Sequence, residues 1–320
     1  MKIAIIDVVN QDIGLKILFP EADYFINNTE ECTIEFRNKS NSYYKIINNY
    51  DFTKITDVNY DVLFVILPIY DIVSNTPFYK EHIKLLSDKI QTIISNNNFK
   101  KVFIFDNYDY DYDPSKYFIN DKIDIYFKIN YNKNKPYCDK VVPFPFIMFG
   151  EISIIEKCDR GLVSKEEYFK NKFKRVFFTG GLYKHEDPQY NIVRDRISIY
   201  NKIQKYIYNP GRLHYNIFLE QLRNSMFGLD LLGVGEPNKR TFEILLSGSL
   251  LISEKHDMKW PFDDEFCDEI FFSNELEFNN KVFRLYDDND LYLKCLNKQY
   301  DIVKKYFNKE WIRNYIISKI

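Results

Sequence analysis

Short apolar runs alternate along the chain with segments whose apolar residues recur at helical spacing. In the first half, the almost continuously apolar runs are residues 2–6, 61–67, 101–105, 123–129 and 140–146. Such runs are typical of strands buried on both faces of a parallel sheet. Between the second and third run, apolar residues repeat as in an amphipathic helix: Ile83, Leu86, Ile90, Ile93 and Ile94. The first half, residues 1–150, is therefore predicted to be a parallel α/β domain.

The same alternation restarts in the second half, after a connector over residues 151–172. Further strands are expected at 175–181, 227–231, 249–253 and 269–273. Helices are expected from Asn191 through Ile207, over 215–226 and 239–247, and from Asn289 to Ile320. This pattern predicts the α/β class, with two Rossmann-like, doubly wound domains facing a central cleft. The second domain would cover residues 173–300.

Composition and charge exclude several classes of protein. The chain has 320 residues, 45% of them hydrophobic, and a net charge of −2. Near-neutral charge argues against a general nucleic-acid binder, so we expect no nucleic-acid partner. No apolar run approaches the roughly 20 residues of a membrane span, and the N-terminus lacks a secretion signal, which favours a cytoplasmic protein. The five cysteines are dispersed without the paired spacing of a zinc site, so we expect no metal.

The most specific pattern is the segment GVGEPNKRTFEILLSGSLLISE, residues 233–254. Asn238 is a favourable N-cap and Gly248 a favourable residue after a helix end, which predicts a helix over 239–247. Gly233 and Gly235 bracket the preceding loop, where glycine lets a ligand approach the backbone closely. The segment therefore predicts a ligand-binding loop followed by a short helix.

Two cations open this helix, although a helix N-terminus already carries partial positive charge. A bound phosphate explains them, because it accepts hydrogen bonds from the first N–H groups and is neutralised by Arg240. Glu243 lies one turn further along the same face, where it can accept hydrogen bonds from the vicinal diol of a ribose. Asn238 and Gly235 would complete this nucleotide site. The alternative is an exposed ion pair between Arg240 and Glu243, with no ligand.

The segment 224–254 resembles the donor-binding motif of GT-B glycosyltransferases and is most similar to the CgeB-like and exostosin-like groups. The matching positions are Arg240, Phe242, Glu243 and Gly248. The resemblance implies a UDP- or GDP-linked sugar whose diphosphate contacts Arg240 and whose ribose contacts Glu243. It also implies that the final helix, 301–320, crosses back to the first domain, which would bind the acceptor. Retaining members carry two glutamates eight positions apart, whereas Glu236 and Glu243 are seven apart.

The loop after the strand at 175–181 offers further ligands for a diphosphate. Gly180 and Gly181 expose backbone N–H groups, Lys184 follows them, and Arg194 lies on the next predicted helix. With cations and N–H groups in place, we expect the departing diphosphate to need no metal ion and the enzyme no cofactor. The alternatives are an ordinary tight turn for the glycines and a solvated helix face for Arg194.

Three side chains are candidates for the base that takes the proton of an acceptor hydroxyl. Asp12 follows the first strand and Asp106 ends the strand at 101–105, and ligand sites gather at such carboxyl ends. His185 lies in the predicted loop after Gly181. Each of the three can equally be a cap or a surface residue.

Two alternatives to a metal-independent glycosyltransferase stay open. Asp109, Asp111 and Asp113 alternate after a strand, as in the metal-binding motif of GT-A transferases. The protein can also be a catalytically inactive, nucleotide-binding scaffold of a glycan-assembly complex. The favoured hypothesis is transfer of a sugar to a hydroxyl acceptor in glycan synthesis, in a virus or bacterium with an AT-rich genome.

Overall fold

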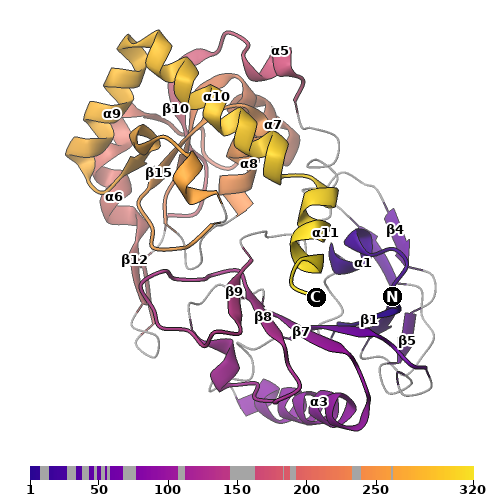
Figure 1. Ribbon diagram of the computed structural model, residues 1–320. Helices are drawn as coiled ribbons and strands as arrows, with labels where there is room; N and C mark the ends of the chain where they lie inside the picture. The colour runs from indigo at the N-terminus through magenta and orange to yellow at the C-terminus, as the bar shows by residue number, and fades with distance from the viewer. Residues whose placement is uncertain are drawn as a thin grey trace. The chain divides into compact units, whose positions relative to one another are not determined.

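The chain divides into two units, shown in Figure 1. Met1–Ile155 and Ile312–Ile320 make the first unit, and Glu156–Trp311 make the second. The computed structural model describes residues 1–7, 14–26, 34–37, 43–46, 49–51, 55, 58–67, 77–106, 112–144, 163–182, 184–187, 192–232, 239–260 and 262–320. Among the helices described, none is both long and apolar enough to cross a bilayer.

The first unit is built on a seven-stranded sheet in the order β5-β2-β1-β6-β7-β8-β9. Its strands are β1 (Ile3–Asp7), β2 (Asp23–Ile26), β5 (Asn49–Asp51), β6 (Val62–Ile66), β7 (Lys101–Asp106), β8 (Ile125–Lys128) and β9 (Val141–Pro143). Every neighbouring pair is parallel. Counted within the sheet, the order is 3-2-1-4-5-6-7, which extends the Rossmann order by one strand. A separate antiparallel hairpin joins β3 (Ile34–Arg37) to β4 (Tyr43–Ile46).

Phenylalanines on neighbouring strands fill the core of this unit. Phe64, Phe103, Phe105 and Phe127 are fully buried, and the rings of Phe105 and Phe127 stack with centroids 4.7 Å apart. The helices of the unit are α1 (Gly14–Leu18), α3 (Pro77–Asn96) and the end of α11 (Lys309–Ile317). Tyr315 of α11 donates a hydrogen bond to the carbonyl of Pro143, 2.6 Å away. The last residues of the chain therefore complete the first unit rather than the second.

The second unit has a five-stranded parallel sheet in the order β13-β10-β14-β15-β16. The strands are β10 (Phe173–Phe177), β13 (Ile207–Tyr208), β14 (Ser225–Asp230), β15 (Leu250–Glu254) and β16 (Phe271–Phe272). The helices are α5 (Lys165–Tyr168), α6 (Arg196–Ile203), α7 (Tyr215–Arg223), α8 (Lys239–Ser247), α9 (Glu275–Asp287) and α10 (Asn289–Tyr306). Counted within the sheet, the order is 2-1-3-4-5, the second common doubly wound order. The predicted α/β class with two parallel sheets is confirmed.

One predicted helix is wrong over much of its length. The sequence predicts a single helix from Asn191 through Ile207, but Ile192 lies in strand β12 (Ile192–Asp195) and Ile207 in β13. Strand β12 pairs antiparallel with β11 (Lys184–Asp187), so the helical part is limited to α6 and the 3₁₀ helix that follows it, Gln204–Tyr206. Isoleucine and valine favour strands through their β-branched side chains, and local pairing outweighs the helical spacing here.

Helix α9 was not predicted, although the sequence carries its start signal. The side chain of Asn274 accepts a hydrogen bond from the N–H of Glu277, and the Glu277 carboxylate accepts one from the N–H of Ser273. This reciprocal arrangement resembles a capping box.

The single helix predicted from Asn289 to Ile320 is interrupted between α10 and α11. The side chain of Asn308 stabilises the break by accepting a hydrogen bond from the N–H of Trp311 at 2.7 Å.

Helix α8 has the bounds that its capping residues predict, Lys239–Ser247. Gly248 ends it with φ 81°, the left-handed conformation expected of a residue after a helix end. Its last carbonyls are bonded, since Tyr168 donates to the carbonyl of Leu245 and Lys172 to that of Gly248. Gln299 of α10 donates to Tyr168 and to the carbonyl of Ser249, both at 2.7 Å. The position of α8 is thus fixed at its C-terminal end by buried hydrogen bonds.

Replacing Gly248 by alanine should destabilise the second unit more than the same change at Gly211. Both glycines have positive φ, of 81° and 80°, so both substitutions incur the left-handed penalty of about 1–2 kcal/mol. A Cβ at Gly248 would also lie 3.1 Å from Cα of Tyr168, whereas one at Gly211 has no neighbour within 4 Å. Thermal and urea unfolding of the two variants measures the difference, and equal losses would contradict the packing argument.

Candidate functional site

The candidate site lies at the carboxyl edge of the second sheet, between β10 and β14. Here the strand order reverses from 2-1 to 3-4-5, and ligands of open α/β sheets bind at such switch points. Strand β10 leads into Gly180 and Gly181, both exposed, and β14 ends at Asp230. Helix α8, the next helix described after β14, begins at Lys239. The edge therefore combines an accessible backbone turn with the start of a helix.

The guanidinium group of Arg240 is held between two aromatic rings at this edge. Its central carbon lies 5.4 Å from the ring centre of Phe178, which follows β10, and 5.3 Å from that of Phe218 in α7. A Cβ at Gly180 would lie 3.4 Å from the Arg240 Nη2 atom. The fold thus brings Arg240 beside the Gly180 backbone, although the two are far apart in the sequence. Cation–π contacts of this kind contribute about 0.5–2 kcal/mol each.

Charges around Arg240 set its electrostatics. Burial lowers the pKa of the Arg240 guanidinium, while the nearby carboxylates of Glu243 and Asp230 raise it. Arg196 adds a further positive charge that lowers the same pKa. A partly desolvated cation next to a second one is a favourable partner for an anion with several oxygen atoms, such as a diphosphate.

Glu243 is buried, with 6% of its surface exposed. Its ion pair is with Lys239, one turn earlier, at 3.7 Å between Nζ and Oε1. Lys239 also lies over the ring of Tyr215, 5.0 Å from its centre. The alternative of a solvent-exposed ion pair between Arg240 and Glu243 is therefore wrong, because the carboxylate is withdrawn from water. Burial of both charges is expensive unless they have a function or strong partners.

Helix α8 is tied to the end of β14 by a buried side-chain hydrogen bond. The Thr241 hydroxyl donates to the carboxylate of Asp230, and both side chains are buried. The N–H of Leu232 donates to Glu254 Oε2 at 3.1 Å, which joins the loop after β14 to the end of β15. These contacts fix where the first turn of α8 lies relative to the sheet edge.

Arg196, the first residue of α6, also belongs to this edge. Its guanidinium donates to the carbonyls of Gly181, Leu231 and Leu232 at 3.1, 2.7 and 3.3 Å. It therefore joins the two turns that follow β10 and β14. The sequence signal is weak, since an arginine at a helix start is common and its carbonyl partners carry no pattern.

The structure describes some of the remaining predicted site residues and not others. Lys184 and His185 lie in strand β11 and Arg194 in strand β12, so the expected loop and helix positions are wrong. His185 and Arg194 are register partners in this hairpin. Gly235 and Asn238 lie outside the described residues, as does the catalytic candidate Asp12. The proposed roles of these residues stay predictions.

In the first unit, Asp106 ends β7 and is completely buried. Its Oδ2 atom accepts from Lys128 Nζ at 2.8 Å, and its Oδ1 from the Tyr112 hydroxyl at 3.0 Å. Lys128 is the register partner of Asp106 on β8 and lies over the Tyr112 ring, 4.3 Å from its centre. A carboxylate with these partners supports the sheet edge directly. A role as base would require an acceptor to displace one of them.

The alternating aspartates of the GT-A alternative are described only at their end. Asp113 accepts hydrogen bonds from the N–H and the hydroxyl of Ser115, at 3.0 and 2.7 Å. It thereby caps the short helix Pro114–Lys116. Asp109 and Asp111 lie outside the described residues.

Comparison with known proteins identifies the fold. No protein-family model and no curated protein matches the sequence. Among solved structures, T4 phage β-glucosyltransferase is similar with a TM-score of 0.50 and 14% identity, over 100% of this chain and 99% of that one. An α-glucosyltransferase solved with UDP and a 13-mer DNA containing an HMU base is similar with a TM-score of 0.50 and 13% identity, again over 100% and 99%. The chain has the GT-B fold, an α/β fold with two parallel sheets.

Removing Lys128 should destabilise the first unit strongly. Lys128→Met leaves the Asp106 carboxylate buried without its cation, which costs about 3–5 kcal/mol. Lys100→Met is the matched control, because the Lys100 ammonium is exposed and its pair with Asp61 is worth about 1 kcal/mol or less. Urea unfolding gives both values. A loss at Lys128 no larger than the control's would show that the buried pair does not support the sheet edge, and the double variant with Asp106→Asn should recover part of the loss.

Proposed function

We propose that the protein is a glycosyltransferase that moves a sugar from a nucleotide-sugar donor to a hydroxyl acceptor. The observation that carries this proposal is the position of Arg240, whose guanidinium lies between Phe178 and Phe218 and beside the Gly180 backbone. This is a site for an anion at the switch point of an open α/β sheet. The GT-B fold and the finer resemblance to the CgeB-like and exostosin-like groups support the same assignment.

The donor diphosphate would bind Arg240 and the N–H groups around Gly180 and Gly181. Negative charge develops on the diphosphate as the bond to the sugar breaks, and cations fixed in advance stabilise that charge without rearranging. Arg240 is fixed in this way by its two aromatic neighbours. Lys184 and Arg194, on the β11–β12 hairpin, are further proposed ligands. With these groups, the transfer would need no metal ion on the diphosphate and no cofactor.

Glu243 would bind the ribose. Its carboxylate is buried one turn beyond Arg240 and already carries an ion pair with Lys239. Two oxygen atoms in one plane match the two hydroxyl groups of a vicinal diol. Sugar transfer would proceed to an acceptor bound by the first unit, with Asp12, Asp106 or His185 as the base.

The structurally similar enzymes bear on the class of acceptor. A β-glucosyltransferase of similar structure is a DNA-modifying enzyme, and the α-glucosyltransferase was solved with DNA. The expectation of no nucleic-acid partner is therefore not supported. The acceptor set to test should include duplex DNA with hydroxymethylated bases beside soluble glycans.

A donor panel tests the proposal with Arg240→Ala as the decisive variant. At least one UDP-, GDP- or CMP-sugar should raise the unfolding temperature and be cleaved, at a rate that added Mg²⁺ or Mn²⁺ does not increase. Arg240→Ala should weaken binding about 10- to 100-fold, because charged hydrogen bonds contribute about 1.5–3 kcal/mol. The control is Arg223→Ala, which removes the same charge at the end of α7, on the amino edge of the sheet where β14 begins.

Three outcomes decide between the functions. Binding and cleavage that depend on Arg240 support the transferase. Binding without cleavage for any acceptor favours the inactive, nucleotide-binding alternative. Donor binding that is equally strong in wild type and Arg240→Ala would contradict the proposed site.

Glu243→Gln should remove the protein's preference for ribose. Because Gln keeps the size of Glu but loses its charge, we expect about a tenfold weaker affinity for the ribonucleoside diphosphate and little change for its 2′-deoxy analogue. Calorimetric titration of both ligands measures this ratio, with Glu166→Gln on the exposed face of α5 as the control. If both ligands weaken equally, Glu243 supports the helix and does not bind the sugar.

A further inference from the structure

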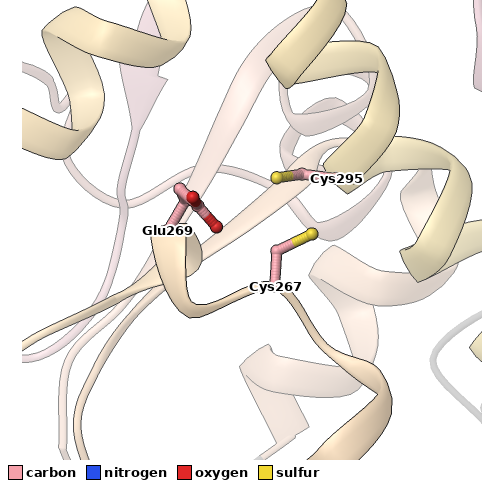
Figure 2. Close-up of side chains that lie close together, drawn as sticks. All are labelled: Cys267, Glu269 and Cys295. Carbon is pink, nitrogen blue, oxygen red and sulfur yellow. The ribbon is translucent and has the colours of Figure 1, made fainter.

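Two cysteines and a glutamate gather in the second unit, away from the strand ends that form the donor site. Cys267 precedes the short helix η5 (Asp268–Ile270), Glu269 lies within it, and Cys295 lies on α10 (Figure 2). Their sulfur and carboxylate ligand atoms all lie within 4.8 Å of one another. Figure 2 shows the three side chains close together, with Cys267 and Glu269 on the turn and Cys295 on the helix. The cluster is of the kind that binds a metal ion.

Both sides of the cluster are positioned by contacts of their own. Helix α10 is fixed by Gln299, which accepts from the N–H of Leu251 and donates to the carbonyl of Ser249. The turn is fixed by the strand that follows it, since Phe271 and Phe272 of β16 pair with the end of β15. The elements that carry the two thiols are therefore positioned by contacts of their own, and the thiols also share a hydrogen bond. Preformed ligand positions lower the ordering cost of binding an ion.

The donor set suits a borderline-soft divalent cation. Thiolate sulfur and carboxylate oxygen are both ligands of Zn²⁺, with bonds of about 2.3 Å and 2.0–2.2 Å. Bonds of that length in a tetrahedron place ligand atoms roughly 3.3–3.8 Å apart, so a closure of about 1 Å suffices. Cys267 and Cys295 are buried, with 6% and 2% of their surface exposed, whereas the Glu269 side chain keeps 27%. The partly exposed Glu269 side chain leaves the cluster accessible from solvent on one side.

The surrounding charges match an ion of charge two. Two thiolates and one carboxylate carry three negative charges, so a bound divalent cation leaves one. Arg284 offsets it, with Nη1 at 3.9 Å from Glu269 Oε1. Without an ion, burial and the neighbouring Cys267 raise the pKa of the Cys295 thiol, which keeps it protonated at neutral pH. Binding of an ion would therefore displace the proton of the Cys295 thiol to solvent.

We propose that Cys267, Cys295 and Glu269 bind one Zn²⁺ ion that joins the turn before β16 to helix α10. The ion has a structural role. It fixes the segment between β15 and β16 against the helix that packs on the sheet, and so supports the edge at which Glu254 bonds Leu232. The three ligands are not among the residues proposed to bind the diphosphate, so the proposal that the transfer itself needs no metal is unchanged.

The test uses the full-length protein, stripped with a chelator under reducing conditions and titrated with ZnCl₂. The expected result is one tightly bound Zn²⁺ per chain, measured by elemental analysis after gel filtration, with a higher unfolding temperature than the stripped protein. Replacing Zn²⁺ by Co²⁺ should give the near-ultraviolet sulfur-to-cobalt absorption of thiolate ligands, a readout that needs no variant. Cys267→Ser and Cys295→Ser should each lose the bound ion and this band.

Two further variants make the test specific. Cys138→Ser removes an exposed thiol outside the cluster and should change nothing. Glu269→Gln should weaken binding about tenfold or more while keeping the thiolate absorption, because only the oxygen ligand changes. The proposal is overturned if the stripped protein takes up no Zn²⁺, or if uptake persists with both cysteines replaced. A Cys267–Cys295 disulfide in the purified protein, with no Zn²⁺ uptake after its reduction, would also overturn it.

Discussion

The candidate site depends on the contacts of the Arg240 guanidinium with two aromatic rings. Phe178 directly follows β10 and Phe218 lies on α7, the helix before β14, so the cation contacts two separate parts of the unit. A cation withdrawn from water is costly unless something of opposite charge stabilises it. Glu243 and Asp230 supply part of that charge. The proposed diphosphate would supply the rest.

Hydrogen bonds around α8 fix the position of Arg240 at this edge. Arg196 joins the turns after β10 and β14 through their carbonyls, and Thr241 ties the first turn of α8 to Asp230. At its other end, α8 is held by Gly248 and by Tyr168, which Gln299 bonds in turn. Fixed dipoles and charges are effective in catalysis because they need not reorganise as the reaction proceeds. The network around α8 is therefore what a preorganised anion site requires.

The sequence predicted the parts of the fold whose signals are local. Continuous apolar runs gave the positions of β1, β6, β7 and β14, and the cap residue Gly248 gave the end of α8. Prediction failed where strand pairing outweighed helical spacing, as in the hairpin that contains Arg194. It also missed contacts between distant residues, such as the pair of Asp106 with Lys128 and the approach of Cys267 to Cys295. No spacing rule reports such contacts, because they depend on strand order and helix packing.

Among the candidate site residues, too, local signals could be predicted from the sequence and packing could not. Arg240 and Glu243 could be found because helix caps and the placement of charges are visible in the sequence. In the structure Arg240 contacts the Phe178 ring and Glu243 is buried, so neither is an ordinary surface residue. The burial of Glu243 was not predictable, since it depends on how α8 packs. The supporting arginine, Arg196, donates to backbone carbonyls, which any sequence provides.

A crystal structure of the protein with the nucleoside diphosphate of its preferred donor tests the central claim most directly. The account predicts phosphate oxygens in contact with the Arg240 guanidinium and the backbone N–H groups near Gly180, with the ribose hydroxyls on Glu243. A nucleotide bound elsewhere, with Arg240 still enclosed by Phe178 and Phe218 and no phosphate beside it, would contradict the account.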